Sequence, residues 1–434
     1  MIRVIRRAQS VSGVVQLPGD KSISHRYAML AALADGSSEI RHFASSLDCR
    51  STLSCLRALG VEVSESRGIL TIVGRGLRGL RAPRGILHAG NSGTTMRLLS
   101  GILAGQPFET RITGDDSLRT RPMRRVIEPL RLMGATVESQ DQGLPPLTIR
   151  GGDLSAIRYP LPVASAQVKS CVLLAGLYGD GPTAVAEPLP TRDHTEIALR
   201  RLGATVRQDG PWIEVDPWPD LAPSRLDVPG DISSAAFFLV AAAIVPGSQM
   251  LMPCVGLNAR RRELLNYLEE AGLDVTVEGE FVVAGESRGD LRVSFGERLL
   301  TGQLPKIEGA RTAALIDEIP VLSVLGSQTA GGLEVSDARE LRVKETDRIA
   351  ALVCNLRAMG AEVEERPDGL VLGGGARLKG ADIDTRGDHR IAMAFAVAGL
   401  AAEGETRIHD AGCADVSYPG FFDTLAEVTG QPND

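Results

Sequence analysis

Six stretches of the chain share one pattern, in which a short polar or charged segment precedes an apolar helix built largely of small residues. They are GDKSISHRYAMLAALADG from Gly19, GNSGTTMRLLSGILAG from Gly90, ASAQVKSCVLLAGLYGDG from Ala164, GDISSAAFFLVAAAIVPG from Gly230, IDEIPVLSVLGSQTAGG from Ile316 and GDHRIAMAFAVAGLAAEG from Gly387. Apolar residues surround each expected helix almost completely, which predicts that all six helices are buried. Their recurrence at roughly 70-residue intervals is typical of repeated supersecondary units.

Amphipathic helices that end in glycine lie between these stretches, and most of them are followed by a pair of strands. The helices are RSTLSCLRALG, RPMRRVIEPLRLMG, RDHTEIALRRLG, RRRELLNYLEEAG, DRIAALVCNLRAMG and, near the end of the chain, FFDTLAEVTG. Alternation around a polar turn predicts hairpins in GVEVSESRGILTIVGRG, GATVESQDQGLPPLTIRGG, GATVRQDGPWIEVDP and GAEVEERPDGLVLGGG. Each repeat is therefore expected to run strand, apolar helix, strand, amphipathic helix and hairpin.

Six repeats are too many for one hydrophobic core, so we expect an α/β protein of two lobes with three repeats each. The buried helices should lie inside each lobe and the sheets outside. The proline-rich segment Trp218–Gly230 precedes the fourth repeat and is the expected boundary. If the buried helices all point their N-terminal ends toward the gap between the lobes, six polar segments converge on one cleft, where function is expected.

Composition narrows the class of partner and compartment. The 434 residues carry a formal charge of −7 and a pI of about 5.6, which argues against a nucleic-acid partner. The longest apolar run, Ala235–Val245, is too short to span a bilayer, and the N-terminus lacks an apolar signal core, so we expect a cytoplasmic protein with no membrane partner. Six cysteines without a CxxC pair and six histidines without HxxxH predict neither disulfides nor a structural metal.

The first polar segment places cations where a helix usually carries acids. Lys21, Ser22 and Arg26 fall on the first turns of a helix for which Gly36 is the expected end. A helix N-terminus is partially positive, so cationic side chains there suggest an anion that binds N–H, hydroxyl, ammonium and guanidinium groups together. The alternative is a solvated lysine beside a serine cap.

Further groups suited to anions occur in the second and third repeats. Gly93 lies in a small hydrogen-bonding turn before Arg97, and its lack of a side chain would let a ligand lie against the backbone. The other groups are Arg119, Arg121, Arg124 and Arg125, then Ser165, Gln167 and Lys169, then Arg192. A solvated helix start for the arginines and a plain N-cap for Ser165 remain alternatives.

The second half of the chain adds acids to this set of cations. Asp317 and Glu318 open the fifth apolar helix, where acids also stabilise a helix on their own. Lys344 and Arg348 are expected on one helix face with Glu345 beside them. In a surface ion pair Glu345 would be ordinary, but in a closed cleft it could exchange a proton with a substrate. Arg390 repeats the cation near a helix start seen at Lys21.

Seven motifs occur in the order and approximate spacing found in 5-enolpyruvylshikimate-3-phosphate (EPSP) synthases, and together they span nearly the whole chain. They are LPGDKSISHR, GNSGTTMR, SAQVKS, TRDHTE, DEIPVL, LRVKETDRI and GDHRIAM. The chain therefore resembles this family of enolpyruvyl transferases. The resemblance implies a two-lobed inverse α/β barrel of six βαβαββ repeats, with residues 15–227 in one lobe and residues 1–14 plus 228–434 in the other. It also implies an active site in the cleft between the lobes.

The resemblance further implies a reaction. Phosphoenolpyruvate would donate its enolpyruvyl group to the 5-hydroxyl of shikimate 3-phosphate, with release of phosphate, in the shikimate pathway of aromatic amino-acid biosynthesis. Both substrates are phosphorylated carboxylates, which suits Lys and Arg groups in an acidic protein. The chemistry needs an acid and a base but no metal or other cofactor. We further expect a monomer whose lobes close on shikimate 3-phosphate.

Matching positions imply roles for individual residues. The groups implied in catalysis are Asp317 as the base for the 5-hydroxyl and Glu345 for the methyl proton, with Lys21 assisting. Phosphoenolpyruvate would be held by Lys21, Gly93, Arg121, Gln167, Arg348 and Arg390. Shikimate 3-phosphate would be held by Lys21, Ser22, Arg26, Ser165, Ala166, Gln167, Arg192, Asp317 and Lys344.

The chain also departs from the family pattern. Val416 stands where many members carry a lysine, and Leu98 stands where much of the family has proline. Gly93 matches members that are sensitive to glyphosate, a mimic of phosphoenolpyruvate, so sensitivity is expected.

Two other functions compete with this reading. One is enolpyruvyl transfer to UDP-N-acetylglucosamine, but ITGDDSLRTRP lacks the reactive cysteine typical of that family. The other is a non-catalytic repeat protein that binds anions. Asp317 and Glu345 argue against it, because a pure anion binder gains nothing from acids. GDKS lacks the spacing of a nucleotide-binding P-loop.

Overall fold

The computed structural model describes residues 1–432, which form two compact units. Unit 1 contains residues 1–18, 229–282 and 287–432, and unit 2 contains residues 19–228 and 283–286. Both units are built of helices and mixed sheets, so the α/β fold class predicted from the sequence is confirmed.

The buried helices of unit 2 correspond to the first three apolar stretches. They are α1 (Lys21–Leu33), α3 (Gly93–Ala104) and α6 (Ala166–Gly176), and most of their residues are buried. Helices α3 and α6 pack closely because Gly101 faces the backbone of Cys171 without a side chain between them. The amphipathic helices are α2 (Leu47–Ala58), α5 (Arg124–Leu132) and α7 (His194–Arg201), each with one buried face.

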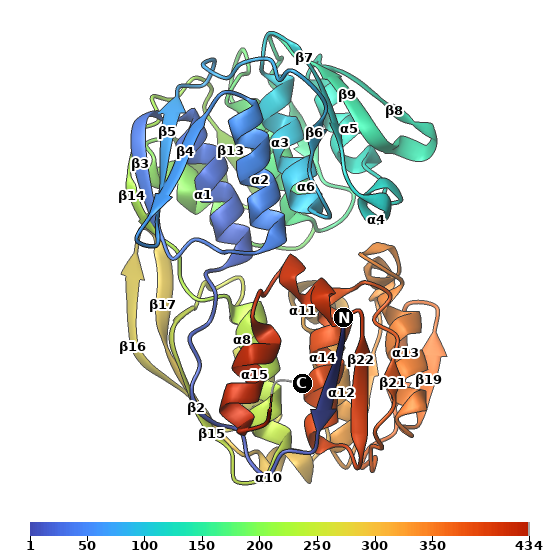
Figure 1. Ribbon diagram of the computed structural model, residues 1–434. Coiled ribbons are helices and arrows are strands. Elements are labelled where there is room, and N and C mark those ends of the chain that lie inside the picture. Colours follow the sequence, from blue (N-terminus) through green and yellow to red (C-terminus); the bar gives the residue numbers. More distant parts are fainter. Residues whose placement is uncertain (433–434) are drawn as a thin grey trace. The chain divides into compact units, whose positions relative to one another are not determined.

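Unit 1 repeats this arrangement with the last three apolar stretches. Its buried helices α8 (Ile232–Ile244), α12 (Ile319–Gln328) and α14 (His389–Ala401) contact one another (Figure 1). Its amphipathic helices are α9 (Glu263–Glu270), α13 (Arg348–Ala358) and α15 (Phe421–Thr429). Short helices are α4 (Asp116–Arg119) in unit 2 and α10 (Glu297–Leu300) and α11 (Gly309–Leu315) in unit 1.

Three sheets of the described residues belong to unit 2. Their strand orders are β14 (Arg225–Asp227), β3 (Asp35–Arg41), β5 (Ile69–Arg75), β4 (Glu62–Ser66); β6 (Leu87–His88), β7 (Glu109–Thr113), β9 (Leu144–Arg150), β8 (Thr136–Gln140); and β10 (Arg158–Pro160), β11 (Thr183–Ala186), β13 (Trp212–Val215), β12 (Val206–Asp209). In each sheet the first pair is parallel and the other two pairs are antiparallel. The same order in all three sheets bears out the predicted repeat of strand, helix, strand, helix and hairpin.

Two of the three described sheets of unit 1 are completed by strands from the start of the chain. Their strand orders are β16 (Val275–Val283), β17 (Glu286–Ser294), β15 (Gln249–Gly256), β2 (Ser12–Val14); β18 (Leu333–Val335), β20 (Gly369–Leu372), β19 (Val363–Arg366); and β1 (Ile2–Arg6), β22 (Glu405–His409), β21 (Asp382–Ile383). Strand β1 pairs antiparallel with β22, and β2 pairs parallel with β15. Residues from the N-terminus thus supply edge strands to repeats that lie far along the sequence.

One predicted helix end was wrong. Helix α1 stops at Leu33 rather than at Gly36, because Ala34 is extended and Asp35 already pairs in strand β3. Gly36 has a φ of 127° and lies against Pro223, so it provides a backbone conformation that glycine adopts readily near the start of β3.

Among the helices of residues 1–432, none combines the length and the apolar character needed to cross a membrane.

The contact between α3 and α6 gives a stability prediction. A Cβ at Gly101 would lie 2.2 Å from the backbone oxygen of Cys171, so Gly101→Ala must separate two buried helices. We expect a loss of about 1–3 kcal/mol of unfolding free energy, measured by urea denaturation. Gly152→Ala is the control, because no atom lies within 4 Å of a Cβ placed there, and it should change stability by less than about 0.5 kcal/mol. Equal midpoints for the two variants would contradict the close packing.

Candidate active site

Lys21, Ser22 and Arg26 lie in the first two turns of α1, as the sequence indicated, but Ser22 does not cap the helix. Asp20 does so, with its carboxylate accepting from the Ile23 N–H. The Lys21 ammonium lies 3.0 Å from Asp48 Oδ2 at the start of α2. A buried carboxylate thus holds this lysine at a helix end that would otherwise repel it.

Arg26 joins the start of α1 to the segment that carries Arg192. Its guanidinium donates to Thr195 Oγ1 at 2.7 Å, to Ser170 Oγ at 2.9 Å and to the Ser22 carbonyl at 2.9 Å. Burial lowers the pKa of Arg26 to about 10, against the opposing effect of Glu196. Arg192 in turn donates to Ser22 Oγ at 3.4 Å. The structure therefore brings together Ser22, Arg26 and Arg192.

Two buried acids, which flank Arg192 in the sequence, pair with Lys169. The Lys169 ammonium lies 3.0 Å from Glu187 and 2.7 Å from Glu196, and all three side chains are nearly inaccessible to solvent. Burial raises the pKa of Glu196, while Lys169 opposes this effect. Because both acids already pair with Lys169, its role is to fix α6 to α7 and the segment between them.

Gly93 and Gln167 meet through Arg97. Arg97 Nη1 donates to Gln167 Oε1 at 2.6 Å, and Gln167 Nε2 donates to Thr94 Oγ1 at 2.9 Å. A Cβ at Gly93 would lie 2.7 Å from Arg97 Nη1. Gly93 is the first residue of α3, so the start of this helix lies beside a guanidinium.

Arg121 is held beside the same helix start by the preceding loop. It donates to Asn91 Oδ1 at 2.6 Å, to the Asn91 carbonyl at 3.2 Å and to Ser117 Oγ at 2.9 Å. Ser165 is the N-cap of α6, as its structural alternative supposed, and Ala166 is the first residue of that helix. The predicted site residues of unit 2 therefore lie on α1, at the starts of α3 and α6, or on the loops that precede α5 and α7.

In unit 1 all five predicted site residues form one cluster around Asp317. Asp317 Oδ1 lies 3.6 Å from Arg348 Nη1 and 3.9 Å from Lys344 Nζ, and Asp317 Oδ2 lies 3.8 Å from Arg390 Nη2. Arg390 also donates to the Asp317 carbonyl at 2.6 Å, which fixes the backbone at this position. Three cations therefore surround the Asp317 carboxylate.

Arg348 is the buried centre of this cluster. Its Nε donates to Asp388 Oδ2 at 2.8 Å and its Nη2 to Glu345 Oε2 at 2.6 Å. Burial disfavours the cation, but Asp388, Glu345 and Asp317 outweigh this effect and raise the pKa of Arg348. Its buried Nη1 has no hydrogen-bond partner within the described chain, although Asp317 lies close. An anion would satisfy that donor.

The expected helix face shared by Lys344 and Arg348 was wrong. Helix α13 begins at Arg348, where Asp347 caps it, and Lys344 ends the short helix η2 (Arg339–Val343) as its C-cap. The two side chains still reach Asp317 because the loop between η2 and α13 turns back on itself. Although 31% of the Lys344 side chain is exposed, desolvation of its ammonium lowers the pKa of Lys344, against the effect of Asp317.

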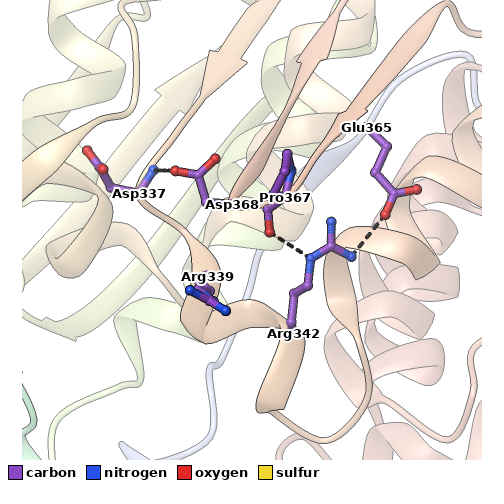
Figure 2. A pocket seen from close by; sticks show the side chains of 6 residues that line it. All are labelled: Asp337, Arg339, Arg342, Glu365, Pro367 and Asp368. Atoms are coloured by element: carbon purple, nitrogen blue, oxygen red, sulfur yellow. Dashed lines mark hydrogen bonds and ion pairs between the residues drawn. The ribbon is translucent and has the colours of Figure 1, made fainter.

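A charged groove of about 740 Å³ lies beside η2, and no predicted site residue lines it. Figure 2 shows Arg342 between the Pro367 carbonyl and Glu365, to which it donates at 2.9 Å each. Arg342 also donates to Asp347 Oδ2 at 2.8 Å. Arg342 therefore ties the start of α13, and with it Arg348, to the hairpin of β19 and β20.

Sequence reasoning missed the acids that hold the site cations. Asp48 reads as an ordinary first-turn acid of an amphipathic helix, and Asp388 as an N-cap, which it also is. The nearest signal was the repeated cation near a helix start, since a buried cation requires a partner. Among residues 1–432, no three His, Cys, Asp or Glu side chains are grouped to hold a metal ion.

Comparison with known proteins gives one consistent family. The model of the family EPSP synthase (3-phosphoshikimate 1-carboxyvinyltransferase) matches residues 5–425. The 3-phosphoshikimate 1-carboxyvinyltransferase of Solibacter usitatus is 51% identical over 99% of this chain and 100% of its own, and that of Salinibacter ruber is 50% identical over the same shares.

Two solved structures are similar to this chain. EPSP synthase from Acinetobacter baumannii has a TM-score of 0.85 and 40% identity, over 98% of this chain and 97% of its own. The enolpyruvyl transferase NikO from Streptomyces tendae has a TM-score of 0.78 at 17% identity, over 98% of this chain and 97% of its own, which shows a shared fold.

The buried pair of Arg348 and Asp388 gives a second stability prediction. Asp388→Asn keeps an N-cap oxygen for α14 but removes the charge that faces Arg348, so we expect a loss of about 1.5–3 kcal/mol in urea unfolding. Asp382→Asn is the matched control, because Asp382 forms an exposed pair with His409, and it should cost less than about 1 kcal/mol. If the two losses are the same, Asp388 does not hold Arg348 as argued.

Proposed function

The chain belongs to the EPSP synthase family, the transferases that move the enolpyruvyl group of phosphoenolpyruvate onto the 5-hydroxyl of shikimate 3-phosphate in aromatic amino-acid biosynthesis, and from this premise we propose how its residues divide the work. The observation that carries the proposal is the cluster of Asp317 and Glu345 with Lys344, Arg348 and Arg390. It combines an acid, a base and anion-binding groups within a few ångströms.

The groups of unit 2 would bind the substrates. Lys21, Gly93, Arg121 and Gln167 would hold phosphoenolpyruvate, and Lys21, Ser22, Arg26, Ser165, Ala166, Gln167 and Arg192 would hold shikimate 3-phosphate. The bonds among Ser22, Arg26 and Arg192 support a common phosphate site for these three. The bonds that hold Arg121 to Asn91 and Gln167 to Arg97 support a second site at the start of α3.

The groups of unit 1 would perform the proton transfers. Glu345, assisted by Lys21, protonates the methylene carbon of phosphoenolpyruvate, which makes the neighbouring carbon cationic. The 5-hydroxyl attacks that carbon while Asp317 takes its proton. The tetrahedral intermediate then loses a methyl proton to Glu345 and its phosphate as the leaving group, which restores the double bond. Arg348 and Arg390 would bind phosphoenolpyruvate, and Lys344 would bind shikimate 3-phosphate.

We propose that both sets of groups act on one pair of substrates in a monomer of the cytoplasm. Neither set alone contains both the acid and base pair and the full group of phosphate ligands. Shikimate 3-phosphate would draw the two lobes together, and a radius of gyration that does not fall on adding it would count against closure. A sedimentation mass of two chains would contradict the monomer.

The first functional prediction concerns phosphate release. Wild-type protein should release phosphate from phosphoenolpyruvate only when shikimate 3-phosphate is present. Asp317→Ala and Glu345→Gln should each lower kcat by about 10²–10⁴, because each removes a group that transfers a proton in the transition state. Phosphate release that requires UDP-N-acetylglucosamine instead would indicate the related family of transferases. No phosphate release with either acceptor would favour an anion-binding protein.

The second functional prediction concerns Gly93 and glyphosate. Glyphosate should inhibit the wild type in competition with phosphoenolpyruvate. In Gly93→Ala the new Cβ would push Arg97 away from Gln167, because only 2.7 Å separates the Cβ position from Nη1. Inhibition should weaken and the KM for phosphoenolpyruvate should rise by about tenfold, equivalent to about one hydrogen bond, while the urea midpoint stays the same. Inhibition of both proteins at one concentration would refute this use of Gly93.

A further inference from the structure

A chain of buried hydrogen bonds joins α1, α2 and α3, and α1 and α3 carry groups proposed to bind phosphoenolpyruvate. His25 Nδ1 on α1 lies 2.6 Å from Thr52 Oγ1 on α2, and Thr52 Oγ1 lies 2.6 Å from Thr95 Oγ1 on α3. Thr95 Oγ1 donates to Ser92 Oγ at 2.8 Å, and the Thr95 N–H donates to the same oxygen at 3.0 Å. All four side chains are fully buried, so no solvent competes for these bonds.

The single proton on each hydroxyl gives this chain a direction. Thr95 donates its proton to Ser92 Oγ at 2.8 Å, with the Asp48 carbonyl as a more distant acceptor at 3.5 Å, so Thr52 must donate to Thr95. Thr52 then has no proton left for His25, so His25 must donate from Nδ1. The opposite direction would leave an Nε2–H buried without an acceptor, since Nε2 has no hydrogen-bond partner. The arrangement favours the neutral Nδ1–H imidazole.

The charges around His25 agree with a neutral ring. Burial lowers its pKa well below 6.5, and the cations Lys21 and Arg26 of its own helix lower it further. A charged imidazole would place a third cation within two turns of α1, together with an unpaired N–H.

The chain ends at the residue that caps α3. Ser92 accepts two hydrogen bonds there and lies between Asn91, which holds Arg121, and Gly93. At the other end, His25 shares α1 with Lys21, and Thr52 shares α2 with Asp48, the partner of Lys21. The three cationic or backbone groups proposed for phosphoenolpyruvate in unit 2 are thus fixed to one hydroxyl chain.

We propose that His25 is a positioning residue that, through Thr52 and Thr95, orients the Ser92 cap and so sets the spacing of Lys21, Gly93 and Arg121 for phosphoenolpyruvate. This inference rests on the proposed function for the identity of the ligand. The hydrogen-bond direction itself does not, since it follows from the buried contacts alone.

The test compares variants that remove a hydrogen-bonding group from this series with variants that keep one. Thr52→Val and His25→Leu should each raise the KM for phosphoenolpyruvate by about tenfold, while the Kd for shikimate 3-phosphate, measured by calorimetry, changes by less than about threefold. Thr52→Ser keeps the hydroxyl, and His25→Asn keeps an N–H near the Nδ1 position, so both should restore the KM to within about threefold of wild type. Thr110→Val is the matched control, because Thr110 is equally buried and its hydroxyl has no partner.

Nuclear magnetic resonance of ¹⁵N-histidine protein provides a second readout that needs no catalysis. His25 in the wild type should show a protonated Nδ1 and an unprotonated Nε2 near neutral pH. The proposal is overturned if Nε2 carries the proton, or if Thr52→Val and Thr110→Val have the same KM. If Thr52→Val and His25→Leu do not fold, the KM of Thr52→Ser and the wild-type spectrum test the proposal. A wild type with no phosphate release would refute the proposed function. The spectrum would then still test the direction of the hydrogen bonds from His25 to Ser92.

Discussion

The ion pair between Arg348 and Asp388 is the interaction on which the site of unit 1 depends. Arg348 is the first residue of α13 and has 1% of its side chain exposed, and a buried guanidinium without a carboxylate would be strongly destabilising. Asp388 satisfies it and also caps α14, so one side chain fixes the start of α14 and the arginine that begins α13. The remaining edge of that arginine faces Asp317 and Glu345.

The same solution recurs in unit 2 with different residues. Lys21 at the start of α1 is held by Asp48 from the start of α2, much as Arg348 is held by Asp388. In both cases a cation lies where the helix dipole is unfavourable, and a buried acid from a neighbouring helix start compensates. The acid holds the cation in place for a substrate anion, which would otherwise have to order a mobile side chain as it binds.

The repeats could be predicted from the sequence because their patterns depend on local chemistry. Apolar runs such as that of α8 are buried on all sides, and hairpins such as β4 and β5 follow from alternation and turn residues. The sheet that an edge strand joins could not be predicted so easily. Strands β1 and β14 each pair with a strand that is distant in sequence. The pattern of a short edge strand carries no information about which sheet it joins.

The same distinction between local patterns and distant partners applies to the residues of the site. Cations at helix starts were visible at Lys21 and Arg390, because they violate the usual preference for acids there. The residues that hold site cations in place were not visible in the same way: Asp48 for Lys21, Asn91 for Arg121 and Asp388 for Arg348 read locally as a first-turn acid, a turn residue and an N-cap. The prediction that Lys344 and Arg348 share a helix face failed for a related reason: Asp347 is a strong N-cap, so the helix starts at Arg348, four residues after Lys344.

The charges of the Asp317 cluster explain how one site can both bind anions and move protons. Lys344, Arg348 and Arg390 are matched by Asp317, Glu345 and Asp388, so the cluster has no net charge by formal count. An arriving phosphate or carboxylate makes it negative, which favours protonation of one of its acids. Asp388 is fully buried and bonded twice to Arg348, whereas Glu345 is the most exposed of the three acids at 19%. In the proposed reaction, the substrate's own charge would therefore favour a proton on Glu345, the most exposed of these acids.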